Sequence, residues 1–147
     1  MSEILFRGRR IDNGEWATGF YFKRLDTLGK TIESIIIEDA YSQVSYGEMY
    51  IRSDIGKECW RVDPATVGQY IGLKDKNGNK IFDGDIMRLC QAAHPCLVYW
   101  DGRGWAWMQN RKRRDIDLTR EAMQIIGNIH DNPELLEEAR GSLPGIF

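Results

Sequence analysis

Two aspartates on either side of a glycine, Asp83 and Asp85, come nearest to the spacing of a catalytic metal site. Paired carboxylates can bind Mg²⁺ and support phosphodiester hydrolysis. Such a site needs further acidic ligands and a base, and the sequence has neither at a diagnostic spacing. A glycine-centred corner, whose aspartates accept hydrogen bonds from backbone N–H groups, explains the same residues. We predict no catalytic residues and keep a metal-dependent phosphodiesterase as the least favoured alternative.

Two further sets of side chains have the chemistry of metal ligands. Cys90, His94 and Cys96 offer thiols and an imidazole, but their spacing is not that of a zinc knuckle or finger. The loop from Asp75 to Asn79 begins like a calcium-binding EF-hand, yet the chain lacks the glycine and the bidentate glutamate that such a loop needs further on. Its Asn-Gly pair predicts a hairpin turn instead, because both residues tolerate positive φ. We predict no metal site and no cofactor.

Clustered arginines and tryptophans are the strongest candidates for a binding surface. If the N-terminal arginines and the basic run near residue 112 meet in space, they could contact phosphates. Two tryptophans that lie two residues apart share one face of a strand and could stack on bases. The same side chains could instead form a solvated surface and a buried core. The candidate nucleic-acid-binding residues are Arg7, Arg9, Arg10, Arg111, Lys112, Arg113, Arg114, Trp105 and Trp107.

Composition sets the limits on the class of protein. The chain has 147 residues, 42% of them apolar and 29% charged, which is typical of a globular protein. Its net charge of −2 gives no global attraction to nucleic acid or anionic lipid. Neither a signal peptide nor an apolar run of about 20 residues is present. Three cysteines, an odd number, favour reduced thiols in a cytoplasm.

Alternating apolar residues and turn signals predict a chain made mostly of strands. Residues 4–22 read as a hairpin around Asp12-Asn13-Gly14. Residues 31–37 form a strand inside a longer ambiguous segment, 25–58, and residues 60–110 form a β-meander. A basic loop at 110–114 precedes a strand at 123–129 with Gly127 as its bulge. Asn132 as N-cap, Pro133 at the first helical position and Gly141 at the end predict a short helix.

Three motifs together resemble the YopX-like family of phage and prophage proteins. They are FRGRRIDNGEWATG (6–19), VDPATVGQYIGLKDKNGNKIFDGDI (62–86) and IIGNIHDNPELL (125–136). The resemblance implies a mostly β protein, with a small barrel reminiscent of SH3-like folds around the Gly-Asp corner, that tends to self-associate. The family usually has no assigned activity, and no catalytic residues carry over. The shared positions include Gly72, Gly78 and Gly84, which can all be read as turn and packing residues.

These observations predict a mainly β fold, with α+β as the alternative. We expect a small SH3-like β-barrel with an N-terminal hairpin, an insertion and a short C-terminal helix. Residues 1–147 form one domain, or alternatively divide into 1–59 and 60–140. We expect a phage or prophage accessory protein in the cytoplasm of the bacterial host, acting as a non-enzymatic binding or assembly module. Its expected partners are a second copy, and alternatively nucleic acid or a phage or host protein, but no membrane.

Overall fold

The computed structural model describes residues 4–38, 59–91, 93–116 and 123–141, and the fold is mainly β, as predicted. The chain divides into two compact units, residues 1–69 and residues 70–147. The prediction of one domain, and the alternative division after residue 59, stay predictions. Much of the insertion predicted at 25–58 lies outside the described residues.

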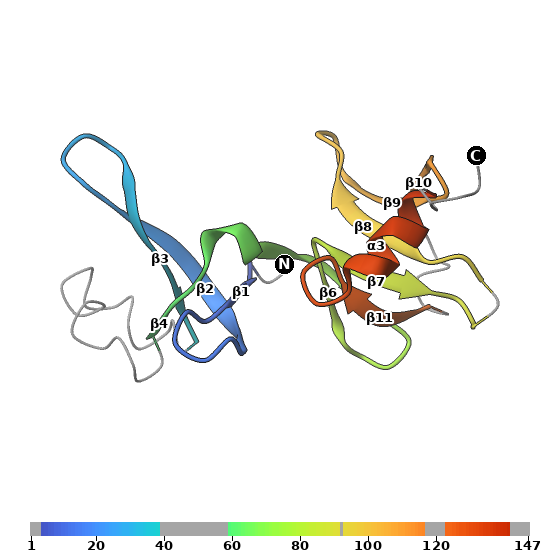
Figure 1. Cartoon of the computed structure of the whole chain (residues 1–147), viewed down its shortest axis with the longest axis horizontal. Helices are drawn as coiled ribbons and strands as arrows, with labels where there is room; N and C mark the ends of the chain where they lie inside the picture. Colours follow the sequence, from blue (N-terminus) through green and yellow to red (C-terminus); the bar gives the residue numbers. More distant parts are fainter. Residues whose placement is uncertain (1–3, 39–58, 92, 117–122, 142–147) are drawn as a thin grey trace. The chain divides into compact units, whose positions relative to one another are not determined.

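The first unit is an antiparallel sheet built on two consecutive hairpins (Figure 1). Its strands pair in the order β4-β3-β2-β1, and the start of β5 pairs with β1. The hairpin predicted at 4–22 and the strand predicted at 31–37 are both confirmed. The elements of this unit are β1 (Phe6–Arg9), β2 (Trp16–Leu25), β3 (Thr31–Ile37), β4 (Cys59–Arg61), the 3-10 helix η1 (Pro64–Thr66) and the start of β5 (Gly68–Lys74).

Side chains of β3 point alternately to the two faces of this sheet and enter two different clusters. Ile35 and Ile37 pack with Cys59, whereas Ile36 packs with Ala17 and Val62, and all six are fully buried. β2 and β3 approach so closely that a Cβ on Gly19 would lie 2.1 Å from the carbonyl oxygen of Ile37. Gly19 therefore marks a close approach of two backbones, which a side chain would prevent.

The second unit begins within β5 and places a hairpin, a sheet and a helix against one another (Figure 1). Ile71 and Ile81 of the β5–β6 hairpin pack on Met87, Val98 and Trp107 of the five-stranded sheet. Helix α3 contacts β7, β8, β9 and β11, and buries Ala139. The remaining elements are β6 (Lys80–Phe82), β7 (Asp85–Arg88), β8 (Cys96–Trp100), β9 (Trp105–Gln109), β10 (Lys112–Asp115), β11 (Gln124–Asn128) and α3 (Pro133–Arg140).

Neither sheet closes into the SH3-like barrel that we expected. In the first unit, an isolated bridge between Arg10 and Val62 joins the ends of β1 and β4 among the described residues. A closed barrel needs a continuous ladder there. In the second unit the order β10-β9-β8-β7-β11 leaves β10 and β11 as opposite edges. The prediction of a barrel is therefore wrong, although the mainly β class is confirmed.

Two local predictions in the second unit also need correction. The segment 110–114 is not a loop, because Asn110 and Arg111 adopt positive φ values of 50° and 68° and turn the chain back into β10. Helix α3 begins and ends where predicted, with Gly141 at φ 77°. Asn132 does not cap it with its side chain, since its Oδ1 accepts from the Asn128 N–H at 3.2 Å.

We expect Gly19→Ala to destabilise the protein by about 1–3 kcal/mol, because the added methyl group must push β2 and β3 apart. Unfolding in urea, followed by tryptophan fluorescence, measures this change. Gly104→Ala is the matched control, since a Cβ at Gly104 meets nothing within 4 Å, and its effect should stay within about 0.5 kcal/mol. Equal effects of the two variants would contradict the packing argument.

Candidate functional site

The end of the β8–β9 hairpin presents two tryptophans side by side. Trp100 and Trp105 are directly opposite each other in the ladder, and their rings meet edge to face with centroids 5.2 Å apart. Such a cross-strand pair stabilises a hairpin end. Trp100 is 53% exposed, so one ring remains available to a partner. Sequence analysis singled out Trp105 and Trp107, but Trp107 is 3% exposed within the core and offers no face for stacking.

Asp101 organises the turn beside these rings. Its Oδ1 accepts from the N–H groups of Arg103 and Gly104 at 2.8 and 2.9 Å, and its Oδ2 accepts from Arg113 on β10. The backbone donors, followed by the Arg113 guanidinium, lower the pKa of Asp101 to about 2. Arg113 also pairs with Asp115 at 2.6 Å. This guanidinium is therefore compensated by two carboxylates.

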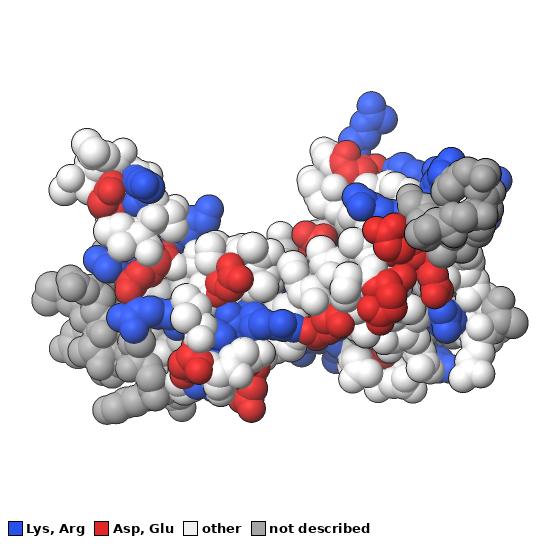
Figure 2. Space-filling model, in the orientation of Figure 1, with Lys and Arg blue, Asp and Glu red and all other residues white. Residues whose placement is uncertain are grey.

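The basic run lies on the edge strand β10 and the turn before it. All four residues of β10 are exposed, and Figure 2 shows Lys and Arg side chains beside Asp and Glu over this end of the unit. Lys112 and Arg114 take part in no ion pair among the described residues. They alternate with Arg113 and so point to the other face of the strand. Of the predicted cations in this run, these two are exposed and have no carboxylate partner in the part of the chain that the structure describes.

The N-terminal arginines lie in the first unit and are engaged with aromatic rings. The guanidinium carbons of Arg7 and Arg9 lie 4.9 and 5.0 Å from the ring centroid of Trp16. Arg10 lies over Trp60 and forms a bidentate pair with Asp12. Cation–π contacts of this kind fix the side chains locally. The N-terminal arginines and the basic run at 111–114 therefore belong to different units, and each forms a separate surface.

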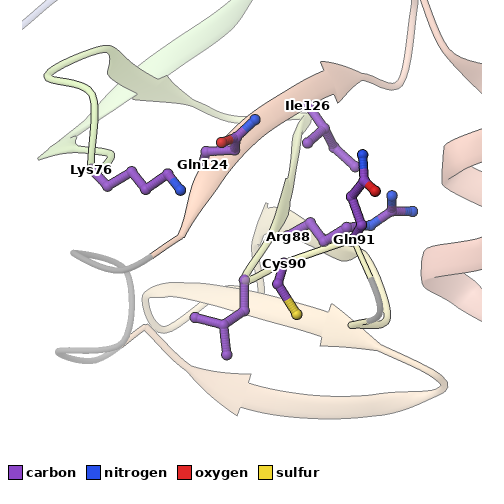
Figure 3. Close-up of a pocket in the computed structure, with 7 residues that line it drawn as sticks. Lys76, Arg88, Cys90, Gln91, Gln124 and Ile126 are labelled. Carbon is purple, nitrogen blue, oxygen red and sulfur yellow. The ribbon is translucent and has the colours of Figure 1, made fainter.

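A pocket of about 360 Å³ opens where β7 ends and β11 begins (Figure 3). Lys76 extends toward Gln124 along one side, and Arg88, Cys90 and Gln91 line another. These side chains could hold a small polar or anionic group. Arg88 already pairs with Glu138 at 3.4 Å, which offsets its charge. The arrangement contains no acid–base pair that would indicate catalysis.

The side chains that sequence analysis considered as metal ligands do not form a metal site among the described residues. Asp85 is 1% exposed and accepts from the Phe82 N–H at 2.8 Å, beside Gly84 at φ 90°. Burial raises the pKa of Cys96 to about 11, so this thiol stays protonated, while Cys90 is exposed. No group of three or more His, Cys, Asp or Glu in the described ranges is placed to hold a metal ion.

The end of the β2–β3 hairpin is an apolar surface that sequence reasoning missed. Leu25, Leu28 and Ile32, which we call the hairpin tip, are 53%, 90% and 50% exposed. Asp26 fixes the turn by accepting from the N–H groups of Leu28 and Lys30, both at 2.9 Å. Figure 2 shows uncharged atoms at this end of the hairpin and charged ones behind them. The available signal was a leucine inside the turn Asp-Thr-Leu-Gly, where the hairpin's own sheet cannot bury it.

The fold and these surfaces define a mainly β protein that presents exposed apolar and aromatic groups on hairpin ends. The chain belongs to the YopX family, because the family model for YopX protein matches residues 6–137. Among solved structures, the chain is similar to protein EF1440 from Enterococcus faecalis, with 22% identity and a TM-score of 0.54. That match covers 93% of this chain and 100% of the other, and it supports the fold.

No curated protein matches the chain. In the part of the chain that the structure describes, none of the helices has the length and apolar character needed to span a membrane.

We expect Asp101→Asn to weaken the pH dependence of stability in acid. The pKa of Asp101 is lowered in the folded state, so its stabilisation is complete above the ordinary value of 3.8 and is lost as the pH falls toward 2. Melting temperatures measured from pH 5 to pH 2 should fall less steeply in this variant than in the wild type. Asp115→Asn removes the same charge but keeps the turn acceptor, and it should retain the wild-type slope.

Proposed function

We propose that this YopX-family chain is a phage or prophage accessory protein in the bacterial cytoplasm that acts as a non-enzymatic binding or assembly module. The observation that carries this proposal is the hairpin tip. Of the eight large hydrophobic residues exposed in the described part of the chain, six lie in the first unit, and Leu28 is the most exposed of all. Apolar groups gathered on a projecting element are typical of interaction surfaces.

The rigidity of the hairpin supports a role in recognition. Six residue pairs join β2 to β3. The carboxylate of Glu33 pairs with the Nε atoms of Arg24 and Arg61, at 2.8 and 2.7 Å. The Arg24 and Arg61 guanidiniums lower the pKa of Glu33, so this network stays ionised at neutral pH. A hairpin held in this way presents its tip without a large loss of conformational entropy on binding. We propose self-association as the first use of the tip, and a phage or host protein as the alternative.

We expect Leu28→Ser to weaken self-association, because burying one leucine contributes about 1.5–3 kcal/mol. Light scattering over a concentration series should show the dissociation constant rising by about tenfold or more. Leu89→Ser is the matched control, since Leu89 is 50% exposed in the second unit, and it should behave like the wild type. A wild-type protein that stays strictly monomeric at high micromolar concentration would overturn the assembly role.

A second candidate function is nucleic-acid binding through β10. The observation that favours it is the exposure of Lys112 and Arg114 without a carboxylate partner among the described residues, in the same unit as the exposed ring of Trp100. Cations of this kind bind phosphates by releasing counterions, which makes the affinity depend on salt.

We expect the double variant Lys112→Glu/Arg114→Glu to abolish any gel shift of duplex or single-stranded DNA seen at low salt. Each lost phosphate contact should reduce the slope of log affinity against log salt by about one. Lys30→Glu, which changes a charge in the first unit, serves as the control. Absence of a shift by the wild type at low salt would end this candidate.

A further inference from the structure

We propose that the pocket where β7 ends and β11 begins binds a small organic phosphate. The pocket lies in the second unit, whereas the hairpin tip belongs to the first, so this role is additional to binding or assembly through the tip. Its volume of about 360 Å³ lies near the lower end of the range for small-molecule pockets, about 300–1,000 Å³. The ligand is therefore one phosphate on a compact organic group.

Backbone contacts fix the positions from which the polar lining side chains extend. Arg88 and Gln124 are directly opposite each other in the β7–β11 ladder, so their side chains lie on the same face of the sheet. The Lys76 N–H donates to the Met123 carbonyl at 3.0 Å, which holds the β5–β6 turn beside the start of β11. Lys76 and Arg88 therefore reach the pocket from two different elements, and both elements are attached to the β11 segment.

The described lining of the pocket is cationic. It contains Lys76 and Arg88 but no Asp or Glu. Lys76 is exposed and forms no ion pair with a described residue. Arg88 donates from Nη2 to Glu138 at 3.4 Å, which is longer than the roughly 2.7–2.9 Å of a close charged hydrogen bond. Its Nε is buried without a partner among the described residues. Glu138 thus satisfies only part of the guanidinium, and the pocket favours an anion.

The donors of the lining favour a phosphate over a carboxylate. Besides the two cations, Gln91 and Gln124 present side-chain amides that form no hydrogen bond with a described residue. Lys76 and Gln124 lie on one side of the pocket, and Arg88 and Gln91 on another (Figure 3). A phosphate monoester offers three acceptor oxygens and a charge of about −1.5 to −2, which matches two cations. A carboxylate offers two oxygens and a single charge.

Two apolar side chains in the lining indicate that the phosphate belongs to an organic molecule. Leu89 is 50% exposed and Ile126 is half-buried, and both line the pocket. A compact apolar group on the ligand would remove part of this surface from water, which is favourable. Inorganic phosphate would leave both side chains in contact with water.

Cys90 reports whether the pocket is occupied. It lines the pocket and is exposed, whereas Cys59 and Cys96 are buried, so iodoacetamide should alkylate Cys90 first in the folded protein. Mass spectrometry measures the rate. Phenyl phosphate, at about ten times the dissociation constant found by calorimetric titration, should slow this alkylation about tenfold, because roughly nine in ten pockets are then filled. Inorganic phosphate and benzoate should each bind about tenfold more weakly or worse.

Replacing one lysine tests the location of the site. Lys76→Gln should weaken the binding of phenyl phosphate about tenfold, because it removes a charged hydrogen-bond donor at an exposed position. Lys74→Gln is the matched control, since Lys74 is an exposed lysine at the end of β5 that does not line the pocket. It should bind like the wild type. Melting temperatures of both variants should equal that of the wild type.

Four outcomes would overturn the proposal. The first is a wild-type protein that does not bind phenyl phosphate at millimolar concentration. The second is binding that leaves the alkylation of Cys90 unchanged, and the third is equal weakening by Lys76→Gln and Lys74→Gln, since the ligand would then lie elsewhere. The fourth is equal affinity for inorganic phosphate or benzoate, which would refute an organic phosphate as the ligand. None of these results depends on the light-scattering test of assembly.

Discussion

The buried carboxylate of Asp75 holds the layers of the second unit together. Its Oδ1 accepts from the N–H groups of Asn77 and Asn79, both at 2.9 Å, and its Oδ2 accepts from the Ile125 N–H at 3.0 Å. The first two bonds close the β5–β6 turn, and the third ties that turn to β11. Burial acts to raise the pKa of Asp75, but the three N–H donors outweigh it and lower the pKa. A charged group at 6% exposure is thereby accommodated.

Because Asp75 anchors this turn, the β5–β6 hairpin lies against the sheet and the apolar side chains between them pack together. Ile71 and Ile81 reach Val98 and Trp107 only because β5 and β6 lie over that face. On the other side, a Cβ at Gly127 of β11 would lie 2.2 Å from the Oδ1 of Asn132, just before α3, and 3.1 Å from the Cδ1 of Leu135 in the helix. The second unit therefore uses most of its apolar side chains internally. Among the described residues, the large apolar side chains that it leaves exposed are Leu89 and Trp100, beside the charges of β10.

Much of the strand pattern could be predicted because local signals and tertiary packing agree. Asn77-Gly78 lies at a hairpin turn, with Gly78 at φ 81°, and Gly127 lies at a shift in register. The strand β10 could not be predicted, because its turn places Arg111 at positive φ, which arginine rarely adopts. The barrel was predicted wrongly, since closure depends on pairing between distant strand edges and leaves no local signal in the sequence.

The candidate surfaces were harder to predict than the fold. Charge and aromatic content pointed to the arginines and to Trp107, but their roles depend on contacts that spacing does not specify. Arg10 is paired with Asp12, Arg113 with Asp101 and Asp115, and Trp107 is in the core. The residue type of Leu28 gave no signal, because an exposed leucine differs from a buried one only in its surroundings; its place inside a turn was the one available hint.

The sequence of β10 has a consequence for how copies of the chain can meet. A sheet edge offers unpaired backbone groups that another edge can join, which leads to open-ended sheet growth. Here the edge consists of Lys112, Arg113, Arg114 and Asp115, all exposed. Lys112 and Arg114, which have no carboxylate partner among the described residues, would repel the same edge of a second molecule and oppose edge-to-edge pairing of sheets. Association through this edge is thus suppressed, and growth into fibres is opposed by the same residues that carry the unit's surface charge.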